Sequence, residues 1–501
     1  DVCSSDLNSI INISVKESYT MNTTKEKTLE QVTEEFIHDF FARSKNPEKQ
    51  DVIADATSSH LKHLKEIGIP EKGRLPEEVV TEMAEQVYAY GYRSEHPRFL
   101  GFVPSTASKL SWLGDIMTSA FNRHAGSMAN FPAGCTIENE LLAWLCQKAG
   151  FSSQAGGLFV SGGSMANLTA LTIARDKILG ENRWHLGTAY VSEQTHSSVA
   201  KGLHIIGIPD SHIRKIAVDE EFRMDVRHLE QAIQKDLENG LLPFAVIASA
   251  GTINTGSVDP FVEISAICKK HHIWMHVDGA FGASVLLCRQ YRHLLKGIEL
   301  ADSLSWDAHK WLFQTYGCGM VLVNDKSNMV KTFHSHPEYL KDLDTEEEYL
   351  NPWNLGVELT RPARGLKLWI TLQVMGSSAV SDAIAHGFHL AECAQQELLK
   401  NRDVEIVSPA RLATLNFRYA PAGLTEKQKD ELNLRISREI IASGFAGIFT
   451  TELNGKKVLR ICAIHPDTTQ ADMRQIVRRL NDYYYEQRSK IQPSAMDQFA
   501  S

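Results

Sequence analysis

Between residues 158 and 323, short apolar runs alternate with stretches long enough to form a helix. An apolar run of this kind, bounded by polar or glycine-containing stretches, is typical of a buried strand. The repeated alternation predicts a wrapped α/β domain with a central, mostly parallel sheet of about seven strands, in which ligands collect at the strand ends. The predicted strands span residues 158–161, 189–192, 213–218, 245–250, 273–277, 303–306 and 320–323.

The sequence on either side of this region follows other patterns. From residue 28 to 86 the apolar spacing is helical and is interrupted by prolines, and helical spacing resumes at 110–123 and 136–148. After residue 371 the pattern is mixed and includes the dipeptide Asn454-Gly455, a strong hairpin signal. This part predicts a small α+β domain with a strand at 412–418, helices at 426–443 and 470–487, and hairpin strands at 448–453 and 457–464.

These patterns divide the chain into segments. We expect an N-terminal helical segment at 21–120, a large α/β domain at 121–375 and a small α+β domain at 376–501. Residues 1–20 are expected to be a non-native or disordered extension. Their first seven residues resemble the translation of a common sequencing adapter, and Met21 is a natural starting point.

Composition excludes several classes of function. The 501 residues are 43% hydrophobic and 23% charged, with a formal net charge of −9, so neither nucleic acid nor an anionic membrane is an expected partner. The eight cysteines are scattered without a CxxC pair, which favours neither a metal site nor a disulfide framework and fits a reducing, cytoplasmic compartment. No run of eighteen apolar residues and no signal-peptide pattern is found.

A carboxylate and an amine follow two of the predicted strands. Asp278 ends the apolar run 273–277, and Lys310 follows the run 303–306 after a short turn. Pyridoxal phosphate needs both groups, because a lysine amine forms a Schiff base with its aldehyde and a carboxylate binds its ring nitrogen. The alternative is an ordinary surface lysine and a salt-bridged acid, and the pair alone does not decide between them.

Other residues near the predicted strand ends could serve the same ligand. The turn 161–167 (Ser-Gly-Gly-Ser-Met-Ala-Asn) opens a helix whose free N–H groups would favour an anion, although it is not a nucleotide P-loop and such turns are often only turns. Thr252 and Ser303 could donate hydroxyl groups to a phosphate, although each taken singly more often bonds backbone. His196 could stack on a planar cofactor, although a lone loop histidine is usually structural or exposed.

Taken together, the motifs resemble the group II pyridoxal-phosphate decarboxylases, from about residue 28 to 487. A closer likeness to bacterial tryptophan decarboxylases lies in 70–74, 111–120 and 359–365. The family motifs are His276-Val277-Asp278-Gly279-Ala280, Ala301-Asp302-Ser303, Asp307-Ala308-His309-Lys310-Trp311, Ser161-Gly162-Gly163-Ser164 and Gln194-Thr195-His196-Ser197-Ser198. The resemblance implies an α/β, fold type I (aspartate aminotransferase-like) subunit and a homodimer with its active site at the interface.

The resemblance also implies roles for individual residues. Lys310 is then the Schiff-base lysine, Asp278 the partner of the ring nitrogen, and His196 the residue stacked on the ring. The positions implied to surround the cofactor otherwise are Gly163, Ser164, Thr252, Ala280, Ser303, Asp307 and His309. Two positions depart from the family pattern. Asp307 stands where asparagine is common, so we expect it to turn away from the phosphate and bond backbone, and Cys135 stands where many members have threonine.

The resemblance further implies a reaction and a substrate. Tyr339 matches the loop tyrosine that protonates the α-carbon after decarboxylation, and phenylalanine replaces it in relatives that make aldehydes. Five acids between 342 and 348 favour an exposed lid, although an acidic loop with an incidental tyrosine is the alternative. Phe102, His124 and Trp353 match positions near the indole of tryptophan-specific relatives.

We therefore expect decarboxylation of an aromatic L-amino acid, with tryptophan (to tryptamine) first and phenylalanine (to phenethylamine) second. Other enzymes on the same fold remain alternatives: a glutamate-type decarboxylase, an aldehyde synthase or an aminotransferase. A catalytically silent homologue that binds pyridoxal phosphate is an alternative of another class.

Overall fold

The structure is a computed structural model that describes residues 27–45, 47–103, 106–334 and 350–491. The chain divides into two compact units, residues 1–91 and 92–501. The boundary falls within the short strand β2 (Gly91–Tyr92).

The first unit is mainly helical, as its apolar spacing predicts. Thr28 caps α2 through a reciprocal pair of hydrogen bonds with Gln31, Thr57 caps α3, and Pro76 occupies the first turn of α4. Its elements are α2 (Leu29–Arg43), η1 (Pro47–Lys49), β1 (Ile53–Ala54), α3 (Ser58–Ile67), α4 (Pro76–Glu82) and the π-helical turn η2 (Met83–Val87).

The second unit contains the predicted seven-stranded sheet, with strand order β3-β9-β8-β7-β6-β4-β5. All neighbours pair in parallel except at β9, which is antiparallel to both β3 and β8. Every predicted strand exists, with ends shifted by two or three residues at most. The strands are β3 (Gly156–Val160), β4 (Gly187–Ser192), β5 (Ile213–Ile216), β6 (Leu242–Ser249), β7 (Trp274–Asp278), β8 (Ser303–Asp307) and β9 (Gly319–Val323).

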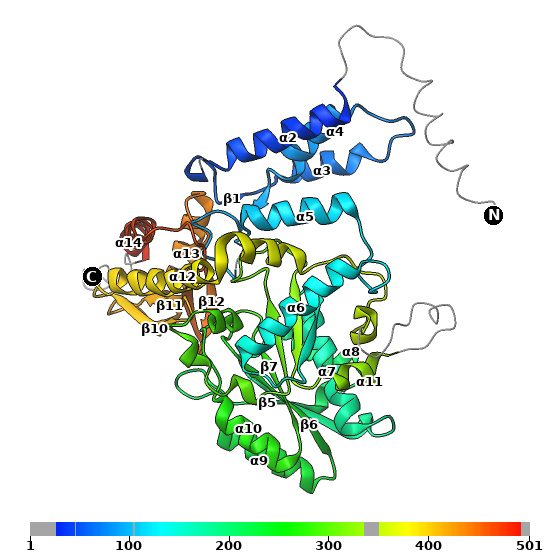
Figure 1. The fold of residues 1–501 in the computed structure, drawn as a ribbon. Helices are drawn as coiled ribbons and strands as arrows, with labels where there is room; N and C mark the ends of the chain where they lie inside the picture. Colours follow the sequence, from blue (N-terminus) through cyan, green and yellow to red (C-terminus); the bar gives the residue numbers. More distant parts are fainter. Residues whose placement is uncertain (1–26, 46, 104–105, 335–349, 492–501) are drawn as a thin grey trace, which may run out of the picture. The chain divides into compact units, whose positions relative to one another are not determined.

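Both faces of this sheet are buried, which explains why its strands are continuously apolar. Along β6, Val246 and Ala248 join one core, whereas the alternate residues Ala245 and Ile247 join another. Helix α7 lies on the second face, and α6, α9 and α10 lie on the first (Figure 1). These helices are α5 (Lys109–Phe121), α6 (Pro132–Ala149), α7 (Gly163–Leu179), α8 (Ser197–Ile205), α9 (Val226–Glu238), α10 (Phe261–His271) and α11 (Ser327–Phe333).

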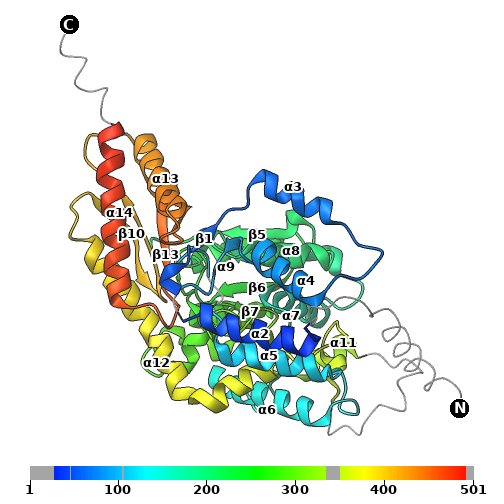
Figure 2. The same cartoon turned by 90° about the horizontal axis from the view of Figure 1, so that it is seen from above.

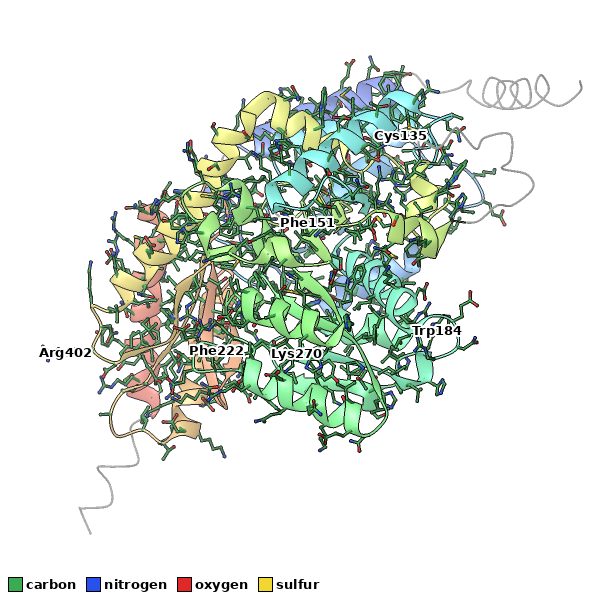
Figure 3. The ribbon with its side chains drawn as sticks, turned by 60° about the horizontal axis from the view of Figure 1, so that its bottom comes forward. Cys135, Phe151, Trp184, Phe222, Lys270 and Arg402 are labelled. Carbon is green, nitrogen blue, oxygen red and sulfur yellow. The ribbon has the colours of Figure 1, made fainter. Side chains whose placement is uncertain are left out.

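Short 3-10 turns occupy several of the connections between these elements. They are η3 (Trp184–Leu186), η4 (Asp210–His212), η5 (Gly282–Leu287), η6 (Arg292–Leu295), η7 (Ile298–Leu300) and η9 (Pro352–Leu355). The helices α9 and α10 extend along the outer side of the unit, where Lys270 marks α10 in Figure 3.

A long helix leads to the smaller sheet. Helix α12 (Leu366–Leu398) contacts α5 and α6 near its start and α14 and β10 near its end (Figure 2). It bends at Gly376, whose φ of 76° is not helical. The small sheet has the order β10-β11-β13-β12. Its elements are β10 (Val404–Arg411), β11 (Thr414–Tyr419), α13 (Glu426–Ala442), β12 (Phe449–Leu453), β13 (Lys456–Cys462) and α14 (Gln470–Ile491).

The sequence patterns did not predict two of these elements. Strand β10 contains Pro409 and half-buried polar residues, which conceal its alternation, and the sheet tolerates them because β10 is an edge strand. Helix α12 spans the change of pattern at residue 371, and Gly376 interrupts its period. Among the described residues, no helix combines the length and apolar character needed to cross a bilayer.

An ion pair with a buried carboxylate joins α9 to strands β4 and β5 of the seven-stranded sheet. Asp236 on α9 accepts hydrogen bonds from Tyr190 Oη (2.8 Å) and from Arg214 Nη2 (2.7 Å) and Nε (2.8 Å). Burial alone would raise the pKa of Asp236, but these hydrogen bonds outweigh it and hold the pKa below its ordinary value.

The variant Asp236→Asn is expected to lower the free energy of unfolding at pH 7 by about 1.5–3 kcal/mol, because the hydrogen bonds from Arg214 and Tyr190 lose their charged acceptor. A carboxyl group with a lowered pKa stabilises the fold above its unfolded pKa of about 4 and loses that effect as pH falls. Urea unfolding at pH 7, 5 and 3.5 should therefore show a difference from wild type that shrinks only below about pH 4. Asp210→Asn, at an exposed position, is the control, and a difference independent of pH would contradict the assignment.

Candidate active site

Asp278 and Lys310 lie at the same end of the strands of the central sheet. Asp278 is the last residue of β7, and β8 runs parallel to it with Asp278 opposite Ser305. Strand β8 ends at Asp307. The turn that follows, in which Lys310 N donates to Asp307 O, keeps Lys310 at the same end of the strands. The lysine side chain is 25% exposed. The carboxyl ends of adjacent parallel strands thus hold the two predicted groups.

Three donors hold the half-buried carboxylate of Asp278. Ala280 N (3.1 Å) and Ser305 Oγ (3.3 Å) donate to its Oδ1, and Asn167 Nδ2 (3.0 Å) donates to its Oδ2. A carboxylate offers about four lone-pair positions, so one position on Oδ2 stays open for a further donor.

The glycine turn before α7 lies directly beside these strand ends. A Cβ on Gly163 would lie 2.8 Å from Asp307 Oδ2 and 3.1 Å from Ala280 Cβ, so only glycine fits without displacing them. Gly319 on β9 is equally constrained, because its Cβ would lie 2.5 Å from Asp307 Oδ1. Ser164, in the first turn of α7, is exposed, and its hydroxyl is open to a ligand.

Asp307 does not turn away to bond backbone, and that prediction is wrong. Its Oδ2 lies 3.3 Å from Lys310 Nζ and 3.6 Å from His309 Nε2, because the turn after β8 folds both side chains back over the carboxylate. Burial lowers the pKa of His309, and the Asp307 carboxylate offsets only part of that effect. Asp307 Oδ1 and His309 Nδ1 are both buried without a hydrogen-bond partner.

His196 begins helix α8 with an exposed ring. Its Nδ1 accepts a hydrogen bond from Ser198 N (3.2 Å) and lies 2.8 Å from Ser198 Oγ. Asn167 Nδ2 also donates to Ser198 Oγ (3.2 Å), so His196 and Asp278 are joined through one amide. Ser198 thus holds the Nδ1 side of the imidazole, while the residue as a whole stays exposed.

The two predicted phosphate hydroxyls have other partners. Ser303 lies at the amino end of β8, where its Oγ accepts from Trp274 Nε1 and lies 2.8 Å from His276 Nδ1. The prediction that it binds the cofactor is therefore wrong, because a strand of five residues separates it from the ligand-facing end. Thr252 Oγ1 lies 2.7 Å from Thr255 Oγ1 and accepts from Ser257 N, which favours the local backbone role considered for it.

The predicted substrate residues fall into two clusters. His124 and Trp353 pack edge to face with ring centroids 6.2 Å apart, and both are tied to Gly126. Phe102 instead stacks on Phe449, with centroids 4.8 Å apart, and is 52% exposed. Tyr339 lies outside the described residues.

Sequence reasoning missed Asn167, Ser198 and Ser305. Asn167 and Ser198 end two of the motifs quoted above, and Ser305 is the register partner of Asp278. Cys135, which departs from the family pattern, is buried on α6, where its thiol donates to Ser127 O (3.4 Å) (Figure 3). Within the part of the chain that the structure describes, no cluster of His, Cys, Asp or Glu could hold a metal ion.

Comparison with known proteins identifies the class. Residues 59–420 match the pyridoxal-dependent decarboxylase conserved domain, and the chain belongs to this family. Its cofactor is pyridoxal phosphate.

Individual relatives resemble the chain along most of its length. The chain is 40% identical to an aromatic-L-amino-acid decarboxylase from Bacillus atrophaeus over 82% of this chain and 86% of the relative. It is 28% identical to tryptophan decarboxylase 2 from Oryza sativa over 89% and 92%. A crystal structure of an Oryza sativa enzyme, described as TDC with PLP and tryptamine, superposes with a TM-score of 0.87 at 25% identity, covering 93% of this chain and all of the other.

Proposed function

We propose that this decarboxylase acts on an aromatic L-amino acid, with L-tryptophan, giving tryptamine and carbon dioxide, as the preferred substrate and L-phenylalanine second. One observation carries the proposal: Asp278 and Lys310 lie at the carboxyl ends of adjacent parallel strands, beside a glycine turn. The 40% identity to an aromatic-L-amino-acid decarboxylase supports the substrate class.

The residues present fit pyridoxal phosphate. The open lone pair of Asp278 Oδ2 suits a protonated ring nitrogen, and the buried, unpartnered atoms of Asp307 and His309 need ligand or water contacts. Lys310 would bind the aldehyde, His196 would cover the ring and Ala280 would support its other face. Gly163 and Ser164, at the start of α7, would receive the phosphate. When bound, the cofactor supplies an electron sink for the electrons that carbon dioxide leaves behind.

The protein's own residues then decide which bond breaks and where the proton goes. Asp278 would accept a hydrogen bond from the ring nitrogen, and His196 would limit the tilt of a flat ligand. Lys310 Nζ lies 3.3 Å from Asp307 Oδ2, so this carboxylate would hold the amine beside the ligand whenever the amine is not bonded to it. Tyr339 would donate the proton to the α-carbon, which makes the product an amine.

The cations near the site favour an aromatic over an acidic substrate. A glutamate-type decarboxylase needs a cation that is free to bind the side-chain carboxylate. Arg98 is not free for this role, because it pairs with Asp472 at 3.3 Å, and neither is Arg361, which is buried against Glu138 at 2.7 Å. His124 and Trp353 instead offer aromatic surface, which packs on flat side chains.

A homodimer accounts for an exposed apolar surface. Helices α5 and α12 lie side by side (Figures 1 and 2) and carry large apolar side chains that are 36–66% exposed. These side chains are Leu113, Met117 and Phe121 on α5, and Trp369 and Val374 on α12. A second copy covering this surface would bury it, and a pocket at the interface could bring Phe102 to the site from the other subunit. A monomer in sedimentation analysis at micromolar concentration would contradict this.

The substrate assignment is tested by product analysis. The holoenzyme is incubated separately with tryptophan, phenylalanine, tyrosine and glutamate, and the amine, aldehyde and carbon dioxide are quantified. We expect equimolar tryptamine and carbon dioxide, with tryptophan favoured over phenylalanine by about 10–200-fold in kcat/KM, the range that a hydrophobic pocket provides. Aldehyde as the main product would favour an aldehyde synthase, and glutamate as the best substrate would reject the aromatic assignment.

A further inference from the structure

A continuous set of hydrogen bonds runs behind Asp278, away from the proposed cofactor position. Trp274 Nε1 donates to Ser303 Oγ (2.8 Å), which lies 2.8 Å from His276 Nδ1. His276 Nε2 lies 2.9 Å from Asn167 Oδ1, and Asn167 Nδ2 donates to Asp278 Oδ2 (3.0 Å). Asn167 comes from α7 and the other four residues from β7 and β8, so the set joins the helix to the sheet.

Donor and acceptor chemistry allows one direction along this set. A carboxylate only accepts, so the amide nitrogen of Asn167 faces Asp278 and its oxygen accepts from His276 Nε2. Nδ1 of the neutral ring then accepts from Ser303 Oγ, whose oxygen accepts from the indole N–H of Trp274. The amide therefore has no freedom to flip.

This direction requires His276 to be neutral. The side chain is fully buried, and burial lowers its pKa to about 4, although the nearby Asp278 carboxylate and the backbone of Ser303 act in the opposite sense. At neutral pH the ring therefore has one hydrogen, and the amide oxygen of Asn167, which only accepts, places it on Nε2. His276 bonds Asn167 and not Asp278 itself, so its hydrogen bond reaches the carboxylate through that amide.

We propose that Asn167 is a positioning residue for Asp278, and that His276 holds the Asn167 amide in the one orientation in which it donates to the carboxylate. The bond fixes one lone pair of Oδ2 and leaves the other directed toward the ring nitrogen. This inference rests on the proposed role of Asp278. The Asn167 amide nitrogen also donates to Ser198 Oγ at 3.2 Å. The same amide therefore holds the residue that contacts the His196 ring.

The first test removes the amide. Asn167→Ala is expected to weaken binding of pyridoxal phosphate to the apoprotein by about 10–100-fold, the effect of losing a hydrogen bond to a charged group. It should also shift the absorption and visible circular dichroism of the bound cofactor, because the carboxylate is free to rotate. Asn433→Ala is the matched control: Asn433 is a fully buried helical asparagine in the small domain whose amide bonds Tyr419 O. It should lower the unfolding temperature and leave cofactor binding unchanged.

The second test changes only the residue behind the amide. His276→Leu removes the donor to Asn167 and is expected to weaken cofactor binding several-fold, whereas His276→Gln, which can present an N–H at the same place, should restore most of the loss. The proposal is overturned if the folded Asn167→Ala protein binds the cofactor with unchanged affinity and spectrum, or if the glutamine variant is no better than the leucine variant. Failure of the proposed function is recognised separately, because Lys310→Ala would then bind pyridoxal phosphate with the same visible absorption band as the wild-type protein.

Discussion

Replacement of Lys310 by alanine is expected to abolish the visible absorption band of the bound cofactor and to lower decarboxylation by at least about 10³-fold. The reason is covalent: the amine is the only group of this side chain that can bond the cofactor aldehyde, and it also pairs with Asp307 at 3.3 Å. The measurement is an absorption spectrum after dialysis against excess pyridoxal phosphate, followed by an assay for carbon dioxide release.

Two further variants separate the covalent role from the charge. Lys310→Arg keeps a cation beside Asp307 but cannot form the bond, so it should behave like the alanine variant. Lys296→Ala removes an exposed lysine from the same domain and should retain both band and activity. A visible band that persists in Lys310→Ala would mean that the cofactor is attached elsewhere, and the proposed site would be rejected.

Replacement of Tyr339 by phenylalanine is expected to slow amine formation by about 10²–10⁴-fold, the usual contribution of a positioned general acid. The phenyl ring keeps the size of the side chain and removes the only proton that it can donate. Carbon dioxide and amine should be measured in the same reaction, because loss of the proton donor lowers the yield of amine per carbon dioxide released, whereas loss of substrate binding lowers both equally.

The control is Tyr485→Phe, an exposed tyrosine on α14 that should have no effect on either product. Cofactor binding in the Tyr339 variant should match wild type, because the phenol is not assigned to hold the ring. A near-normal yield of amine would show that another group delivers the proton, and Tyr339 would then have no catalytic role.

The strands of the central sheet could be predicted because both of its faces are covered. Residues such as Ala245 and Val246 are buried on opposite faces, so each strand is a continuous apolar run that stands out from its neighbours. Asp278 and Lys310 stood out for the same reason, as charged groups at the ends of such runs. Strand β10 did not, because an edge strand with one exposed face accepts Pro409 without cost to the core.

Errors at the site have a common origin. Ser303 is near Lys310 in sequence, but it lies at the opposite end of the extended strand β8, where it bonds Trp274 and His276. Asp307 was expected to avoid a phosphate, but the local turn places Lys310 and His309 against its carboxylate. In both cases the partner of a polar group was set by geometry that residue type alone does not encode.

The sequence by itself determined the alternating strand and helix pattern, the family and the acid and amine at the strand ends, because burial restricts which residue types can occupy those positions. Only the tertiary structure decided what each polar group bonds. The amide of Asn167, 111 residues before Asp278, reaches its carboxylate because α7 packs on β7. Hydrogen bonds act over about 3 Å, so their partners are known only once helix and sheet are brought together.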